Sequence, residues 1–71
     1  MKISYDDTVD ALYIRFVDEP RQVTTQRLTE DIAINYDQEG EVVGIEVLSA
    51  REHLFKKEQD LKVVLENLKA A

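Results

Sequence analysis

The sequence predicts an α+β domain: a small antiparallel β-sheet of about five strands in meander-like order, followed by a C-terminal amphipathic helix that packs on one face of the sheet. Apolar and polar residues alternate with a period of two in several short segments of residues 1–48, which is typical of strands with one buried face. Residues 49–71 instead repeat apolar side chains with the period of a helix. We therefore expect a single domain, 1–71, with the sheet in 1–48 and the helical segment in 49–71.

Five segments are expected to form the strands, namely residues 2–6, 11–17, 23–29, 32–37 and 41–48. In the second segment, Leu12, Ile14 and Phe16 share one face by the period of two, and this face is expected to meet the core. The third segment is rich in threonine and is expected at a sheet edge. The fifth segment has apolar residues on both faces, which predicts either an interior strand or a strand whose second face meets a partner.

Turn and helix residues separate these segments. Pro20 cannot donate to a strand ladder, so we expect a loop there. Gly40 suits a tight turn because it adopts a positive φ freely, and Gly44 suggests a bulge or a close backbone approach. Ser49 and Glu52 have the spacing of a capping box, which predicts a helix start. We expect a short first helical segment, a bend near Lys57, and then a helix over about residues 59–70. Its core-facing stripe would be formed by Leu54, Leu61, Val64, Leu65 and Leu68.

The length and the charge limit the possible functions. A chain of 71 residues buries only about 60% of its unfolded surface. Because it has no cysteine for disulfides, self-association is the expected source of extra stability. The net charge is −6, and residues 1–48 hold eleven acidic and four basic side chains, a net charge of −7. Such a body repels nucleic acids and attracts a basic protein. Because there is no secretory h-region and no apolar run near the roughly 20 residues of a membrane span, we expect a cytoplasmic protein without membrane contact.

Acidic clusters are the only candidates for chemistry. Asp6, Asp7 and Asp10 could form a metal or acid–base site, but their spacing lacks a calcium-loop pattern, and turn formation explains them more simply. Glu46 lies between apolar residues in a strand; it either faces solvent, pairs with an arginine such as Arg15 or Arg27, or is a buried acid. His53 is the only histidine, so neither a metal cluster nor a nucleophile triad is indicated. We therefore expect no cofactor, no metal and no enzymatic activity.

Several stretches together resemble domain of unknown function family 2283, a family of small prokaryotic proteins. The residues that carry the resemblance are Tyr5-Asp6, 10–14 (DALYI), 34–37 (INYD) and 43–48 (VGIEVL), and it covers about residues 2–50. It implies a compact antiparallel sheet with a C-terminal helix. No catalytic residue or ligand follows from it. Some members look like partners of small toxin-like proteins, which implies an antitoxin-type role.

Three functions remain open from the sequence. The first is an interaction module for a basic protein, such as a small ribonuclease toxin. The second is a structural homo-oligomer, a dimer or larger, that uses the second sheet face or the helix stripe as its interface. The third is a small-ligand or metal-binding enzyme that uses the acidic turn residues. The candidate interface residues are Val17, Val42, Leu48, Leu61, Val64, Leu65 and Leu68.

Overall fold

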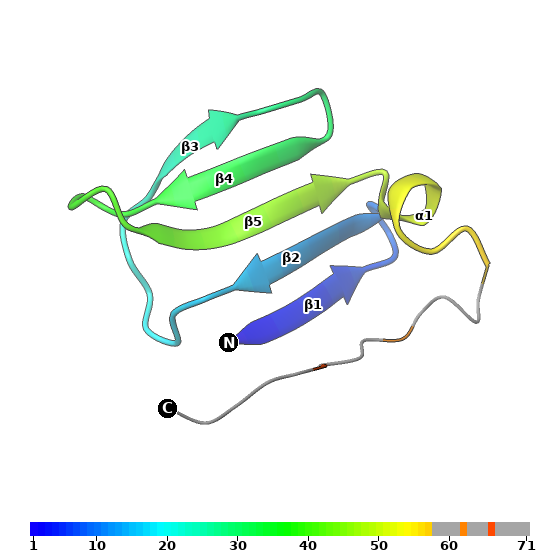
Figure 1. Ribbon diagram of the computed structural model, residues 1–71, viewed down its shortest axis with the longest axis horizontal. Helices are drawn as coiled ribbons and strands as arrows, with labels where there is room; N and C mark the ends of the chain where they lie inside the picture. The colour runs from blue at the N-terminus through cyan, green and yellow to red at the C-terminus, as the bar shows by residue number, and fades with distance from the viewer. Residues whose placement is uncertain (58–61, 63–65, 67–71) are drawn as a thin grey trace.

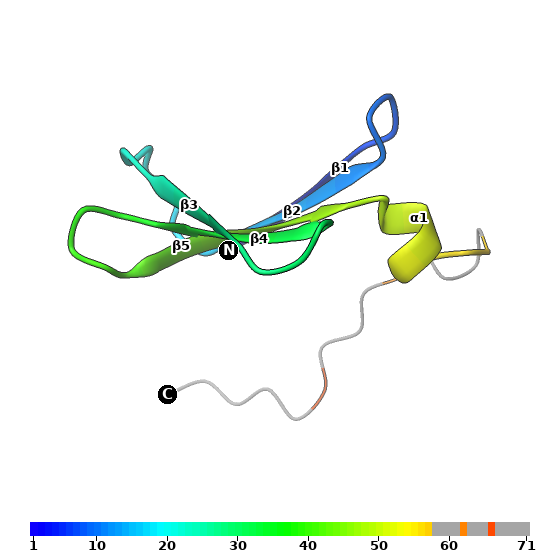
Figure 2. The ribbon, with the colours of Figure 1, turned by 90° about the horizontal axis from the view of Figure 1, so that it is seen from above.

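A computed structural model describes residues 1–57, 62 and 66 of the chain. Five strands form one antiparallel sheet, which Figure 2 shows nearly edge-on as a single twisted layer. They are followed by one short helix, so the predicted α+β class is confirmed. The strands are β1 (Lys2–Asp6), β2 (Ala11–Arg15), β3 (Thr24–Arg27), β4 (Ile32–Tyr36) and β5 (Val42–Leu48), and the helix is α1 (Ala50–His53).

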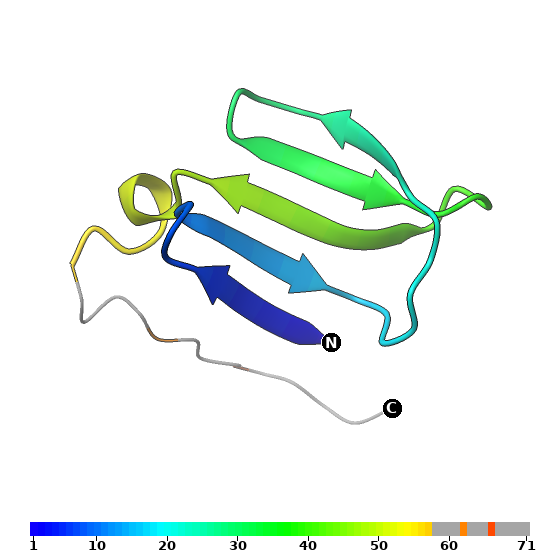
Figure 3. The same ribbon diagram turned by 180° about the vertical axis from the view of Figure 1, so that it is seen from behind.

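The spatial order of the strands is β1-β2-β5-β4-β3, so the expected meander-like order is interrupted once. After β2 the chain does not turn back to pair with the next strand. Residues 16–23 instead run past the start of β5 and the end of β4 to reach the opposite edge, as Figures 1 and 3 show from both sides. This crossover leaves room for β5 at the centre, between β2 and β4, and makes β1 and β3 the edges. The interior position predicted for residues 41–48 and the edge position predicted for residues 23–29 are both confirmed.

The strand register divides the side chains into two faces, because directly opposed residues in an antiparallel pair point to the same side. We call one side the apolar face; it comprises Ile3, Tyr5, Leu12, Ile14, Ile32, Ile34, Ile45 and Val47, with Gln26 of β3 opposite Ile34. We call the other side the polar face; it comprises Lys2, Ser4, Tyr13, Arg15, Thr25, Arg27, Ala33, Asn35, Gly44 and Glu46. A register shift beside Asn35 and Tyr36 adds one residue to β5, as in a β-bulge.

The core is small. Among the described residues, five apolar residues are buried, and no large side chain is completely enclosed. Leu12 and Ile14 are half-buried as expected, but Phe16 is exposed, contrary to the prediction that it meets the core. It follows the end of β2, where none of the described residues covers the sheet. The buried residues are Ala33, Val43, Val47, Ala50 and Phe55.

The helix α1 lies at the end of β5, beside the start of β2 (Figure 1). It starts where the sequence predicted, but the capping box is wrong: Ser49 has a φ of 51°, and its side chain makes no capping hydrogen bond. A left-handed backbone differs from the extended conformation that a capping serine usually adopts. The short first segment is confirmed, whereas the second helix, over about residues 59–70, lies outside the described residues. In the part of the chain that the structure describes, no helix has the length and apolar character needed to cross a membrane.

Candidate functional site

A row of aliphatic side chains crosses the apolar face. In the register, Ile14 opposes Ile3 on one side and Ile45 on the other, and Ile34 continues this row into β4. Ile3 at the β1 edge is 39% exposed, and Phe16, which continues the face beyond β2 by the period of two, is 41% exposed. The other aliphatic residues of the face, apart from the buried Val47, are half-buried. The row of branched aliphatic side chains thus crosses four strands and is partly exposed to water.

Phe55, just after α1, covers one corner of this face. Its ring meets the Tyr5 ring edge-on, with the two centroids 4.8 Å apart and the planes at 89°. The guanidinium carbon of Arg51 lies 5.8 Å from the centroid of the Tyr5 ring, within the range of a cation–π contact. Tyr5 is therefore held between a buried phenylalanine and a cation, and it fixes the position of the helix at the β1 edge. The core position predicted for Leu54 is wrong, because this side chain is 48% exposed. The other stripe candidates, Leu61, Val64, Leu65 and Leu68, lie outside the described residues.

Asp10 is the residue that caps α1. Its carboxylate oxygen Oδ1 accepts hydrogen bonds from the Tyr5 hydroxyl at 2.7 Å and from the Arg51 amide at 3.0 Å, and its backbone oxygen accepts from the Ala50 amide at 3.0 Å. The hydrogen bond from Tyr5 is the largest cause of the lowered pKa of Asp10. Burial of the ring and then the same hydrogen bond raise the pKa of Tyr5. Asp10 thus joins the first turn of the chain to the helix.

The acidic turn behaves as the turn interpretation predicted. Asp6 Oδ1 accepts from both the amide and the hydroxyl of Thr8, and these bonds lower the pKa of Asp6. Asp6 and Asp10 are therefore engaged with different donors, Asp6 within the turn and Asp10 at the helix. Among the residues that the structure describes, no group of three histidine, cysteine, aspartate or glutamate side chains is arranged to hold a metal ion.

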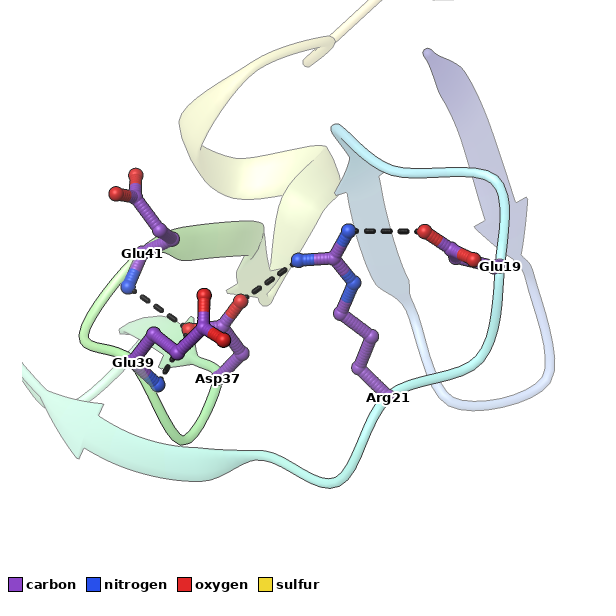
Figure 4. A network of polar contacts seen from close by, with 5 residues as sticks. All are labelled: Glu19, Arg21, Asp37, Glu39 and Glu41. Atoms are coloured by element: carbon purple, nitrogen blue, oxygen red, sulfur yellow. Dashed lines mark hydrogen bonds and ion pairs between the residues drawn. The ribbon is translucent and has the colours of Figure 1, made fainter.

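A second aspartate, Asp37, organises the β4–β5 hairpin (Figure 4). Its Oδ1 accepts from the amides of Glu39 at 2.9 Å and Glu41 at 3.0 Å, while its Oδ2 pairs with Arg21 at 2.7 Å. The hydrogen bond from the Glu41 amide is the leading cause of the lowered pKa of Asp37. Arg21 also pairs with Glu19 at 2.9 Å, and the two carboxylates raise the pKa of the guanidinium. Through Arg21, the hairpin anchors the crossover of residues 16–23.

The remaining acid and histidine candidates have simpler surroundings. Within the described part of the chain, Glu46 has no ion pair with Arg15 or Arg27, and Arg27 instead donates to the backbone oxygen of Glu30 at 3.2 Å. The ion pair considered for Glu46 is therefore wrong: the residues directly opposite Glu46 are Ala33 on β4 and Tyr13 on β2. His53 Nε2 lies 2.8 Å from Asp31 Oδ2, which ties α1 to the β3–β4 turn.

The polar face holds a contact that the sequence did not reveal. Tyr13 leans over Gly44, so that a Cβ built at Gly44 would lie only 2.2 Å from the Tyr13 hydroxyl oxygen. Asn35 Nδ2 donates to that oxygen at 3.0 Å, and Thr25 Oγ1 donates to Asn35 Oδ1 at 2.7 Å. The close approach predicted for Gly44 is confirmed, but its partner depends on the register. The sequence signal for this contact was a tyrosine, an asparagine and a glycine in three separate predicted strands.

The interface candidates of the second sheet face are spread out. Val42 and Leu48 lie at the two ends of β5, six residues and so roughly 20 Å apart. Leu48 opposes Ala11 on the polar face, whereas the register shift pairs Val42 with Tyr36, which lies on the side of Ile34 by the period of two. The two ends of β5 therefore do not share one face, contrary to the expectation from the sequence. Val17 follows β2 and lines a hollow on the polar face. The structure thus places these residues at separate points, whereas the residues of the apolar face are neighbours.

Comparison with known proteins gives one result. A search of curated proteins and a search of solved structures each found no match. The family model described as "Protein of unknown function (DUF2283)" matches residues 2–51, which hold all five strands and the start of α1. The expected resemblance is confirmed: this chain belongs to the DUF2283 family.

Proposed function

We propose that this chain is a non-enzymatic protein-binding module of the cytoplasm, whose apolar face contacts a small basic protein. The observation that supports the proposal best is the row Ile3, Ile14, Ile45 and Ile34, which crosses four strands and ends at the exposed Ile3. Burial of apolar side chains is the main source of affinity in protein complexes. The exposed Ile3 and the half-buried Ile14 and Ile34 would supply such burial.

Charge favours a basic partner. Exposed carboxylates occupy the turns at both ends of the sheet, at Asp7, Glu30, Glu39 and Glu41. An apolar centre with acidic turns around it matches a partner that carries apolar residues within a basic surface, because complementary charge speeds association and selects the partner. The same charge opposes direct binding to nucleic acid. An antitoxin-type role, in which the partner is a small basic toxin, is the specific form of this proposal.

Capture from lysate of the native host tests the proposal, with the tagged full chain as bait at low and at moderate salt. We expect the wild-type chain to recover a basic protein, and the recovery to fall with salt because screening weakens steering by exposed charge. Phe16→Ser should reduce the recovery about tenfold, in line with the loss of an apolar anchor. Val9→Ser is the matched control: Val9 is 64% exposed, but it lies in the β1–β2 turn. Recovery of no basic protein at either salt, or equal recovery with Phe16→Ser and Val9→Ser, would contradict the proposal.

Self-association is a second candidate for the same face. It is favoured by the small core of the described part of the chain, in which five apolar residues are buried and no large side chain is completely enclosed. Sedimentation velocity at micromolar concentration distinguishes the two functions. A homo-oligomer that dissociates on Phe16→Ser would support self-association, whereas a clean monomer would eliminate it and leave the basic partner.

A further inference from the structure

The cations of the sheet are concentrated in one place. Of the four basic residues in 1–48, three line a single hollow of about 300 Å³ on the polar face, beside Tyr13: Lys2, Arg15 and Arg21. One carboxylate, that of Glu19, lines the same hollow. In a sheet half with a net charge of −7, this is a local reversal of charge.

Two of these cations have no carboxylate partner in the part of the chain that the structure describes. Lys2 on β1 lies directly opposite Arg15 on β2, and like charges in this arrangement oppose strand pairing. Among the described residues, no carboxylate lies within ion-pair distance of either side chain. Arg21 differs from them because it is already paired with Glu19 and with Asp37. The unbalanced positive charge of the hollow therefore belongs to Lys2 and Arg15.

Hydroxyl groups and apolar side chains complete the walls. Ser4 opposes Tyr13 in the next register pair on the same face, and both line the hollow. Because the Tyr13 oxygen accepts its hydrogen bond from Asn35, the tyrosine keeps its own hydrogen to donate. Val17 and Val23 form an apolar part of the wall. The two cations and the two hydroxyls can donate hydrogen bonds to an oxyanion. The apolar wall suits an apolar group attached to that oxyanion.

We propose that this hollow binds a small molecule with one phosphate or carboxylate group and a short apolar body, the anionic group lying between Lys2 and Arg15. The guanidinium of Arg15 offers two parallel N–H donors to such a group, and Lys2 adds a point charge. The volume of about 300 Å³ is at the lower end of ligand pockets, so the ligand is small. This site is separate from the apolar face and does not depend on the proposed protein partner.

Titration followed by amide chemical shifts tests the proposal. The probes are phenyl phosphate and phenylacetate, with inorganic phosphate and acetate as the forms without an apolar body, all at constant ionic strength. We expect saturable chemical-shift changes at Ser4 and Val17 with at least one of the two aromatic probes. The probe that binds more tightly shows whether the site prefers a phosphate or a carboxylate. The probes without the apolar body should bind more weakly.

Variants separate a built site from general attraction of anions. Arg15→Gln should weaken binding at least about tenfold, since it removes a charge-assisted hydrogen bond. Arg27→Gln is the matched control, because Arg27 is an exposed arginine on the same face that does not line the hollow. The affinity of this variant for the probe should stay within about twofold of wild type. Lys2→Gln, on the exposed edge strand, gives the same test if Arg15→Gln disturbs the fold. Shifts that grow linearly without saturation, or equal affinities for the arginine variants, would overturn the proposal.

Discussion

The two faces of the sheet are built by different physical means. On the apolar face, branched aliphatic residues meet along the register, and Phe55 is the buried residue that covers one corner through its contact with Tyr5. On the polar face, one ring replaces a layer of side chains: Tyr13 fills the space above Gly44, and hydrogen bonds extend from it to Asn35 and Thr25. The first face gains stability from burial and leaves part of its apolar surface exposed. The second depends on a fixed geometry that a single added methyl group would disturb.

Truncation of Phe55 should have the largest effect on stability. Phe55 is 7% exposed, and its loss removes the edge-on contact with Tyr5 at the covered corner of the apolar face. We expect Phe55→Ala to lower the free energy of unfolding by about 3 kcal/mol, the low end for buried phenylalanines, because the site is at the edge of the core. Urea denaturation measures it. Leu54→Ala is the control, because Leu54 is 48% exposed. Equal losses in the two variants would show that Phe55 does not anchor the helix.

A methyl group at Gly44 tests the polar face. The built Cβ lies 2.2 Å from the Tyr13 hydroxyl oxygen and 2.9 Å from the backbone oxygen of Ile14, so one of these groups has to move. We expect Gly44→Ala to cost about 1–3 kcal/mol, as overpacking usually does. The cost should fall in a Tyr13→Ala background, because the ring is then absent, and a double-mutant cycle measures this coupling.

Gly40→Ala is the matched control for that cycle. Gly40 has a φ of 84° but no atom within 4 Å of the built Cβ, so its cost comes from the backbone alone. We therefore expect it to be independent of Tyr13. A Gly44→Ala cost that is also unchanged by Tyr13→Ala would refute the role assigned to the ring.

Removal of the Tyr13 hydroxyl should have a smaller effect. Tyr13→Phe keeps the ring over Gly44 but leaves Asn35 Nδ2 without its acceptor at 3.0 Å. We expect a loss of about 1 kcal/mol, the usual net value of a hydrogen bond. Tyr36→Phe serves as the comparison, since the Tyr36 hydroxyl has no hydrogen bond to the described residues. If both substitutions leave the midpoint of denaturation unchanged, the hydrogen-bond row contributes nothing to stability.

The smallest expected effect depends on pH. The hydrogen bond from Tyr5 lowers the pKa of Asp10 below its ordinary value of 3.8 in the folded chain. The stability that this carboxylate contributes is therefore complete above about pH 4 and is lost as the pH falls through the lowered folded pKa. Asp10→Asn should lower the thermal midpoint at neutral pH, and the difference from wild type should shrink below pH 4. A difference that stays constant across this range would contradict the assignment of Asp10 as a charged cap.

The strands were predictable from the sequence because alternation depends only on adjacent residues. The period of two placed Ile14 and Ile45 on the apolar face, and the lack of a strictly polar side in residues 41–48 marked the central strand. Alternation assigns a face to each residue but does not select neighbours. The crossover, β3 and β4 all lie between β2 and β5 in the sequence, so alternation could not reveal that β2 pairs with β5. The predicted strand order therefore differed from the observed one.

The contacts of the candidate site were less predictable, because they join residues that are far apart in the sequence. The helix cap illustrates the difference: the local pattern pointed to Ser49, whereas the observed cap is Asp10, whose Oδ1 accepts from the Arg51 amide 41 residues later. The contact of Tyr13 with Gly44 likewise requires the register of two strands. Local patterns fixed the turn role of Asp6, because its partner Thr8 is two residues away.

Site-specific photo-crosslinking tests the central claim, that the apolar face is the protein-binding surface. A photoreactive phenylalanine analogue at Phe16, at the exposed end of the apolar face, is compared in host cells with the same analogue at Thr25, exposed on the polar face. The account predicts a crosslinked adduct with a basic protein from position 16 and none from position 25. Adducts from position 25 alone would contradict it.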